Sequence, residues 1–152
     1  MLNSTKRTRL AKFSPLEDLA EVVHHQVGCM QAVYDFSVDG GAVSTIGLKD
    51  VFGNKAILPS GALIKKVIIH VETALTSGGA ATIAVDSEAA ADLKGATAVA
   101  TYALAANLDG IPDGAAANIV RLTADRQISI AIAVAALTAG KMHIFVDYVV
   151  RA

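Results

Sequence analysis

Residues 128–150, ISIAIAVAALTAGKMHIFVDYVV, carry the clearest structural signal in the chain. Ile128, Ile130, Ile132 and Val134 alternate with small residues, which is the period-two pattern of a strand with one buried face. After residues 137–141, which include a glycine, a second alternating run places five apolar side chains on one face: Met142, Ile144, Val146, Tyr148 and Val150. Two such runs around a short glycine-containing turn predict an antiparallel hairpin.

The same alternation recurs upstream, between turn signals. It covers residues 31–38, 43–48, 62–75 and 81–86, with turns at 40–41, 53–55, 58–61 and 78–79. The shared faces hold Tyr34, Phe36 and Val38 in the first run and Val67, Ile69, Val71 and Thr73 in the third. About seven or eight short strands without a βαβ rhythm predict an all-β (mainly β) fold, an antiparallel β-sandwich.

The middle of the chain, residues 87–118, is rich in alanine, which has a high helix propensity. Gly95, Gly110, Pro112 and Gly114 divide it into short pieces. We expect a helical turn near 88–93, an extended piece near 99–104 and a long loop over 107–118.

The N-terminal 30 residues differ from the rest, and we divide the chain into residues 1–30 and a β-sandwich body, 31–152. The first thirteen residues predict an extended arm, and a helix should follow over 15–26. Ser14 is a suitable N-cap, Pro15 fits the first helical position, and Glu17 completes a capping box. Gly28 is placed to end the helix. One face carries a stripe of apolar residues, which we expect to contact another part of the chain or a neighbour: Leu16, Leu19, Ala20, Val23 and Val27.

Composition indicates a subunit of a larger assembly. Hydrophobic residues make up 53% of the chain, aromatic residues only 5%, and the mean hydropathy is +0.50. The longest uninterrupted apolar run, 130–137, is far shorter than the ~20 residues that a transmembrane helix needs. We therefore expect the surplus apolar surface to be buried between subunits. No signal peptide is visible, and Cys29 is the single cysteine, as in a protein made in a reducing cytoplasm.

Charge is unevenly distributed along the chain. The net charge is −1, yet the first sixteen residues carry four basic side chains and no acidic one. A basic arm on an acidic body predicts docking onto an acidic surface of a partner protein, and four bases without interleaved aromatic residues argue against nucleic acid. The residues expected to dock are Lys6, Arg7, Arg9, Leu10, Lys12 and Phe13, and those expected to contact other subunits are Leu16, Leu19 and Val23.

Few residues suggest chemistry. His24, His25 and Cys29 are close in sequence, but a helix would direct the two histidines about 100° apart, and no second ligand cluster follows. His70 and His143 lie mid-strand near Glu72 and Asp147 without a recognisable catalytic frame. The segment 109–114 has two aspartates but lacks the spacing of a calcium loop. We therefore predict no catalytic site, no metal and no cofactor.

Three segments of the sequence resemble a known family: 58–64 (LPSGALI), 74–85 (ALTSGGAATIAV) and 136–150 (ALTAGKMHIFVDYVV). They are similar to capsid decoration, or cement, proteins of tailed bacteriophages, and the resemblance covers about 31–150. It implies a jelly-roll-like sandwich, commonly a homotrimer, on the outer surface of a virion. The implied partners are the major capsid protein and other copies of the chain, with no nucleic acid, membrane or small-molecule substrate. The protein would be made in a bacterial cytoplasm, and the family has no catalytic residues to carry over.

Other functions stay open at this point. A jelly roll can bind glycans or a receptor, although three Tyr, four Phe and no Trp offer few aromatic platforms. The chain could also be another virion component, from the tail, the neck or a head fibre. An enzyme has the least support.

Overall fold

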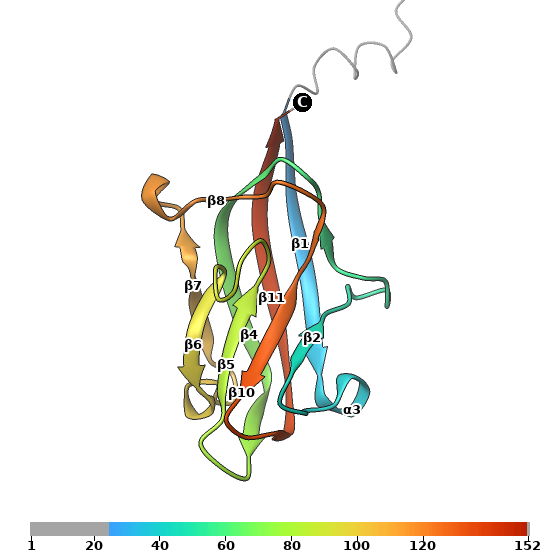
Figure 1. Ribbon diagram of the computed structural model, residues 1–152, viewed down its shortest axis with the longest axis vertical. Helices are drawn as coiled ribbons and strands as arrows, with labels where there is room; N and C mark the ends of the chain where they lie inside the picture. The colour runs from blue at the N-terminus through green and yellow to red at the C-terminus, as the bar shows by residue number, and fades with distance from the viewer. Residues whose placement is uncertain (1–24, 152) are drawn as a thin grey trace, which may run out of the picture.

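The computed structural model describes residues 25–151, which form a β-sandwich (Figure 1). All strand pairs are antiparallel, and the predicted all-β sandwich is confirmed. The larger sheet has the order β1 (His25–Asp35), β11 (Leu137–Arg151), β4 (Ala62–Ser77) and β7 (Asn107–Asp113), and β8 (Val120–Arg121) also pairs with β4. The second sheet has the order β2 (Thr45–Gly47), β10 (Ser129–Ala133), β5 (Thr82–Asp86) and β6 (Lys94–Ala98). The remaining elements are the strand pair β3 (Ile57–Leu58) with β9 (Arg126–Gln127), and the short helices α3 (Phe36–Asp39), η1 (Val99–Thr101) and η2 (Ala116–Asn118).

The strand order is that of a jelly roll. When the eight strands on the two main paths are renumbered in chain order, the sheets run 1-8-3-6 and 2-7-4-5. Two interleaved Greek keys produce this order, and they place the first and last strands side by side. β1 and β11 accordingly pair over the whole of β1, from His25 opposite Arg151 to Asp35 opposite Lys141.

The core lies between the sheets and consists mainly of small and branched aliphatic side chains. β4 and β11 alternate as predicted, and their inward side chains are fully buried: Val67, Ile69, Val71, Met142, Ile144 and Val146. Thr73, expected on the same face, is exposed near the end of β4. Two buried tyrosines donate hydrogen bonds to backbone carbonyls. The Tyr34 hydroxyl is 2.7 Å from Gly40 O, and the Tyr102 hydroxyl is 3.3 Å from Ile83 O. Within residues 25–151 no buried side-chain nitrogen or oxygen lacks a partner.

The predicted hairpin of residues 128–150 is wrong, although both strands exist. β10 pairs with β2 and β5 in one sheet, whereas β11 pairs with β1 and β4 in the other. The link between them, residues 134–136, crosses from one sheet to the other, and Val134 within it has a positive φ of 70°. Gly140, near the start of β11, also has a positive φ (133°). Residues 137–141, predicted as the turn, are the start of β11, where its pairing with β4 is irregular. The alternation of a strand is the same whichever sheet it joins, so it could not distinguish a hairpin from a crossover.

Near the start of the described chain, three boundaries differ from prediction. Residues 25–26, expected to end a helix, belong to β1, and the rest of that predicted helix lies outside the described residues. Gly28 ends no helix but lies within β1, where a Cβ would meet the ring of Tyr148 at 2.4 Å. The strand predicted over 31–38 stops at Asp35, because the Asp35 side chain accepts from the Ser37 N–H and caps the single turn α3.

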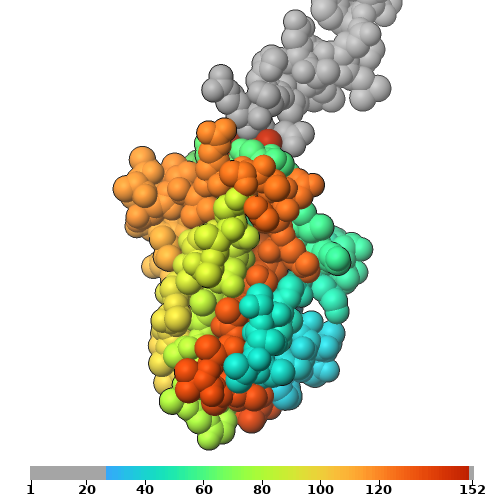
Figure 2. All heavy atoms as spheres, viewed as in Figure 1, coloured from blue at the N-terminus to red at the C-terminus, as the bar shows by residue number. Residues whose placement is uncertain are grey.

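The middle segment is more regular than its composition predicts. Instead of a helical turn, the loop after β5 is held by Asp92, whose carboxylate accepts N–H bonds from Ser87, Glu88 and Ala89. The expected extended piece near 99–104 begins as η1, and the expected loop over 107–118 contains β7. In the space-filling view the segment between β7 and β10, in orange, covers one end of the sandwich (Figure 2).

Gly110 explains how β7 reaches its place. A Cβ at Gly110 would meet Val67 Cβ at 2.5 Å and the Leu93 carbonyl oxygen at 2.6 Å. Leu93 O accepts the Ile111 N–H at 2.8 Å, so the end of the loop after β5 binds directly to β7. A glycine inside a strand marks such a close approach. Here Gly110 lets β7 pack directly against β4 and against the end of the loop after β5.

Candidate docking surfaces

The residues predicted to dock lie outside the described part of the chain. This holds for Lys6, Arg7, Arg9, Leu10, Lys12 and Phe13 of the arm and for Leu16, Leu19 and Val23 of the helix. Any contact surface within residues 25–151 must therefore be found from exposed side chains and from loops whose shape is fixed.

A largely exposed aromatic side chain lies on the loop between β2 and β3. Phe52 has 86% of its surface exposed, the largest fraction among the exposed apolar side chains of the described residues. The loop is held by Asp50, whose Oδ1 accepts the Phe52 N–H at 2.8 Å and the Asn54 N–H at 2.9 Å. Asp50 N–H donates in turn to Asn54 O at 2.7 Å, and Gly53 takes a φ of +88°. Phe52 is thus presented to solvent on a preorganised loop.

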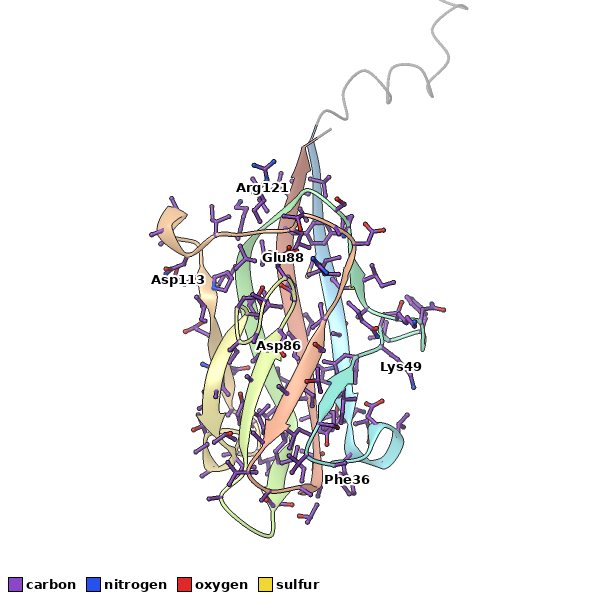
Figure 3. The ribbon with its side chains drawn as sticks, in the orientation of Figure 1. Phe36, Lys49, Asp86, Glu88, Asp113 and Arg121 are labelled. Carbon is purple, nitrogen blue, oxygen red and sulfur yellow. The ribbon has the colours of Figure 1, made fainter. Side chains whose placement is uncertain are left out.

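A depression of about 320 Å³ lies next to this loop, at the flank of the sandwich. Its lining includes Val38 of α3 and Val51, which is 54% exposed, so the depression has apolar walls. Lys49 lies at the same flank and points away from the body (Figure 3). Its Nζ is 3.9 Å from Asp39 Oδ1, which is a weak surface ion pair.

Charges of both signs surround the depression. Asp35, Asp39, Asp50, Lys49 and Lys141 all line it. The Ser37 hydroxyl and N–H lower the pKa of Asp35, with a smaller contribution from the charge of Lys141. Desolvation works to raise the pKa of Asp50, but the N–H groups of Asn54 and Phe52 outweigh it and the pKa is lowered. Asp35 and Asp50 are therefore ionised over the physiological range, and the depression combines apolar walls with charges of both signs.

The two mid-strand histidines take part in hydrogen bonds across strands. His143 Nε2 lies 2.6 Å from Glu72 Oε2, and Gln31 Nε2 lies 3.0 Å from His143 Nδ1. The hydrogen bond with His143, followed by that with Lys141, lowers the pKa of Glu72. His70 Nδ1 is 2.8 Å from Asn107 Oδ1. These contacts order the outer face of the larger sheet, and residues 25–151 contain no group of three His, Cys, Asp or Glu side chains suited to a metal. Of the set weighed as metal ligands, His25 and Cys29 both belong to strand β1, whereas His25 was expected on a helix.

One end of the sandwich carries a strained, exposed turn. Val134 is 73% exposed and has a φ of 70°, which is unusual for a β-branched residue. Ala135 N–H donates to Ala133 O at 2.9 Å, so three residues close the turn. A second exposed apolar residue, Leu104 at 68%, lies in the loop after η1, next to Ala105, which also has a positive φ.

An ion pair fixes two loops to each other. Glu88, in the loop after β5, accepts from Arg126 Nε at 2.9 Å and from Arg126 Nη2 at 3.1 Å. It also accepts the N–H and the hydroxyl of Thr123. These bonds, with Arg126 first, lower the pKa of Glu88 to about 2. The clamp joins the loop after β5 to β9 and to the residues just before it, which are far apart in sequence.

Sequence reasoning missed Phe52 and the depression. Residues 53–55 were interpreted only as a turn, although Asp50 and Gly53 around an aromatic residue are a signal of a tight, side-chain-capped loop. Exposure itself could not be predicted, because aromatic residues are usually buried.

No protein-family model matches the chain, and no curated protein does. Among solved structures, a chain of the acidic stable capsid structure of Helicobacter pylori bacteriophage KHP30 has a TM-score of 0.57 and 16% identity, over 86% of this chain and 92% of that chain. A chain of the cyanophage Pam1 capsid asymmetric unit has a TM-score of 0.56 and 16% identity, over 84% and 87%. A chain of the capsid of Ralstonia phage GP4 has a TM-score of 0.51 and 17% identity, over 84% and 85%. Since both shares are high, each matched chain is close to this chain in length, and the chain shares its fold with a small protein in each of three phage capsid structures.

Proposed function

We propose that this chain is a structural component of a bacteriophage virion, and that it acts as a capsid decoration (cement) protein. In this role it binds the outer surface of the shell that the major capsid protein forms, and it stabilises that shell. The observation that carries the proposal is the fold shared over nearly the whole chain with small proteins of three phage capsid structures. The resemblance of residues 58–64, 74–85 and 136–150 to decoration proteins points the same way.

The loops of the sandwich are already ordered, as suits a protein that functions by binding another protein. Asp50, Asp92 and Glu88 each bind several groups of their own or a neighbouring loop. Loops that are already ordered lose little conformational entropy when they dock. Exposed apolar side chains on such loops, above all Phe52, have the character of interface anchors.

The N-terminal segment adds a second mode of attachment in this proposal. Lys6, Arg7, Arg9 and Lys12 would dock onto an acidic surface of the shell or of a neighbouring subunit, with Leu10 and Phe13 supplying apolar contact. If the body is a homotrimer, three arms act together, because each bound arm raises the effective concentration of the other two. Leu16, Leu19 and Val23 are the proposed subunit contacts of this segment.

A glycan- or receptor-binding role has less support from the described residues. Tyr34 and Tyr102 are buried in the core, so neither can stack on a sugar. Phe52 is a single exposed aromatic beside charged residues, whereas sugar sites depend on aromatic platforms with polar groups around them. A role in the tail, neck or head fibre differs from decoration only in its position on the particle.

The experiment is to image virions by electron microscopy after changing the arm or Phe52. Deletion of residues 1–13 should sharply reduce occupancy on the shell while the purified protein keeps its oligomeric mass, which we expect to be that of a trimer. Phe52→Ser should weaken shell binding about tenfold or more if the ring is buried on docking. Val43→Ser, at another exposed apolar residue (55%), is the control and should bind normally.

The outcomes separate the parts of the proposal. Unchanged occupancy after the deletion would refute the role of the arm, and unchanged occupancy of Phe52→Ser would refute that of the loop. Density confined to the tail or neck would replace decoration by another virion role. Absence of the chain from purified virions would overturn the function as a whole.

A further inference from the structure

The main strand paths of the two sheets end in β1, β7, β2 and β6, and among these described edges β1 is the one that is long and unprotected. β2 has only three residues, and β6 carries Lys94 and Gly95. β7 carries Asp109, Pro112 and Asp113, and its Ile111 N–H is already bound to Leu93 O. Short edges, charges and proline are the usual means by which proteins prevent edge-to-edge pairing. β1 has 11 residues, and residues 26–34 contain no charged side chain and no proline.

The direction of the backbone groups on β1 follows from one bond. Val33 N–H donates to Lys49 O at 2.8 Å on the side away from β11. Because these directions alternate along an antiparallel strand, the backbone groups of Val27, Cys29 and Gln31 point to the same open side. None of the residues 25–151 forms a backbone hydrogen bond with them there.

We propose that this open edge pairs antiparallel with β1 of a second copy of the chain, about a two-fold axis at Cys29. Val27 then faces Gln31 of the second copy, and Cys29 faces its own counterpart. Lys49 occupies the place beside Val33, so the pairing ends at Gln31. Three residue pairs with two bonds each give about six hydrogen bonds, and the two larger sheets become one continuous sheet.

The absence of charge along residues 26–34 of β1 favours a second copy of the chain as the partner strand. An edge that pairs with itself sets like residues close together, and the uncharged run between 26 and 34 avoids any repulsion there.

This contact is independent of the proposed function, because it concerns the protein alone in solution. A two-fold contact is also compatible with a trimer built through other surfaces. In that case each β1 edge would join one trimer to the next. If the β1 edge contact is absent, the proposed virion role still stands. If the virion role is wrong, the edge contact can still form.

The single native cysteine provides a direct test. Residues that face each other in a hydrogen-bonded antiparallel pair have Cα atoms about 5.5 Å apart, which lies within the range of a disulfide. Treatment of the purified full-length chain with the shortest bis-methanethiosulfonate reagent, at mildly alkaline pH, should convert most of the associated protein to a covalent dimer. In a Cys29→Ser, Val43→Cys variant the cysteine is exposed elsewhere, and this control should stay uncross-linked.

A pair of charge variants tests the register. Val27→Lys with Gln31→Lys sets two lysines against each other in both outer pairs, and we expect dimerisation to weaken roughly tenfold or more. Val27→Lys with Gln31→Glu differs only in the sign at position 31, and it should restore association because each lysine then faces a glutamate. Both variants lose the bond between Gln31 and His143, so this loss cannot explain a difference between them. Sedimentation at several protein concentrations gives the dissociation constants.

Three results would overturn the proposal. The first is a chain that sediments as a monomer at every concentration. The second is an associated chain that forms no cross-link at Cys29. The third is equal association of the two charge variants. A trimer without a Cys29 cross-link is a case of the second result.

Discussion

Replacing Gly110 by alanine tests the packing that closes the sandwich. The added methyl group would lie 2.5 Å from Val67 Cβ and 2.6 Å from the Leu93 carbonyl oxygen. Val67 is fully buried and branched at Cβ, and the carbonyl belongs to the backbone, so neither atom can move away by a change of rotamer. β7 must therefore shift away from β4 and from the loop after β5.

The size of the effect follows from these contacts. Overpacking a core position costs about 1–3 kcal/mol, and two rigid neighbours place Gly110→Ala near the upper end. The lower entropy of the unfolded chain offsets about 0.5–1 kcal/mol of this. We expect the free energy of unfolding to fall by about 2 kcal/mol, which corresponds to a loss of roughly 4–8 °C in Tm for a domain of this size.

Urea unfolding followed by circular dichroism gives the measurement, with Gly95→Ala as the matched control. Gly95 lies in the neighbouring strand β6, and a Cβ there meets no atom within 4 Å. The control should have unchanged stability or gain up to about 1 kcal/mol. If the two variants differ by less than about 0.5 kcal/mol with the same m-value, the close approach of β7 is not real and the reasoning fails.

Three further results are expected. Burial, followed by the hydrogen bond and charge of Asp147, raises the pKa of the Cys29 thiol, so Asp147→Asn should lower that pKa and speed alkylation by iodoacetamide at pH 8; an unchanged rate-against-pH profile would contradict this. The pKa of Glu88, about 2, lies below its value in the unfolded chain, so its pair with Arg126 stabilises the fold above about pH 4.5 and loses this effect as the pH falls towards 2. Arg126→Met should therefore unfold in less urea than the native chain at neutral pH, and the two should unfold alike near pH 2. A difference in stability that stays constant at every pH would contradict this pH dependence. Val134→Asn should raise the free energy of unfolding by about 1 kcal/mol, because asparagine tolerates the positive φ and the exposed valine packs against little; thermal unfolding measures it, and a destabilised variant would argue against strain at this turn.

The fold class could be predicted because burial of one face leaves a period of two in each strand. Ile130 and Ile144 are both fully buried on their strands, as their alternation indicates. The sheet that each strand joins depends on contacts far apart in the chain, and this is why a crossover at Val134 was interpreted as a hairpin. Likewise Gly110 was interpreted as a break in the chain, since a glycine that permits close packing and one that forms a loop are identical in sequence.

The surface was less predictable than the core. Phe52 and the loop at Asp50 depend on a network of local hydrogen bonds, and the open edge of β1 depends on which strands flank it. The arm and helix residues predicted to dock lie outside the described residues, so their roles stay predictions.

The pairing of His25 with Arg151 has a mechanical consequence. A load that pulls these two residues apart, perpendicular to the strands, would break the hydrogen bonds between β1 and β11 one at a time. Such peeling requires little force. A pull along the axis of β1, with the opposite end of the sandwich held, would instead strain the whole ladder in shear at once. The same strand pair is thus weak against peeling and strong against axial tension, and the direction of any tether through the preceding residues determines how much load the domain withstands.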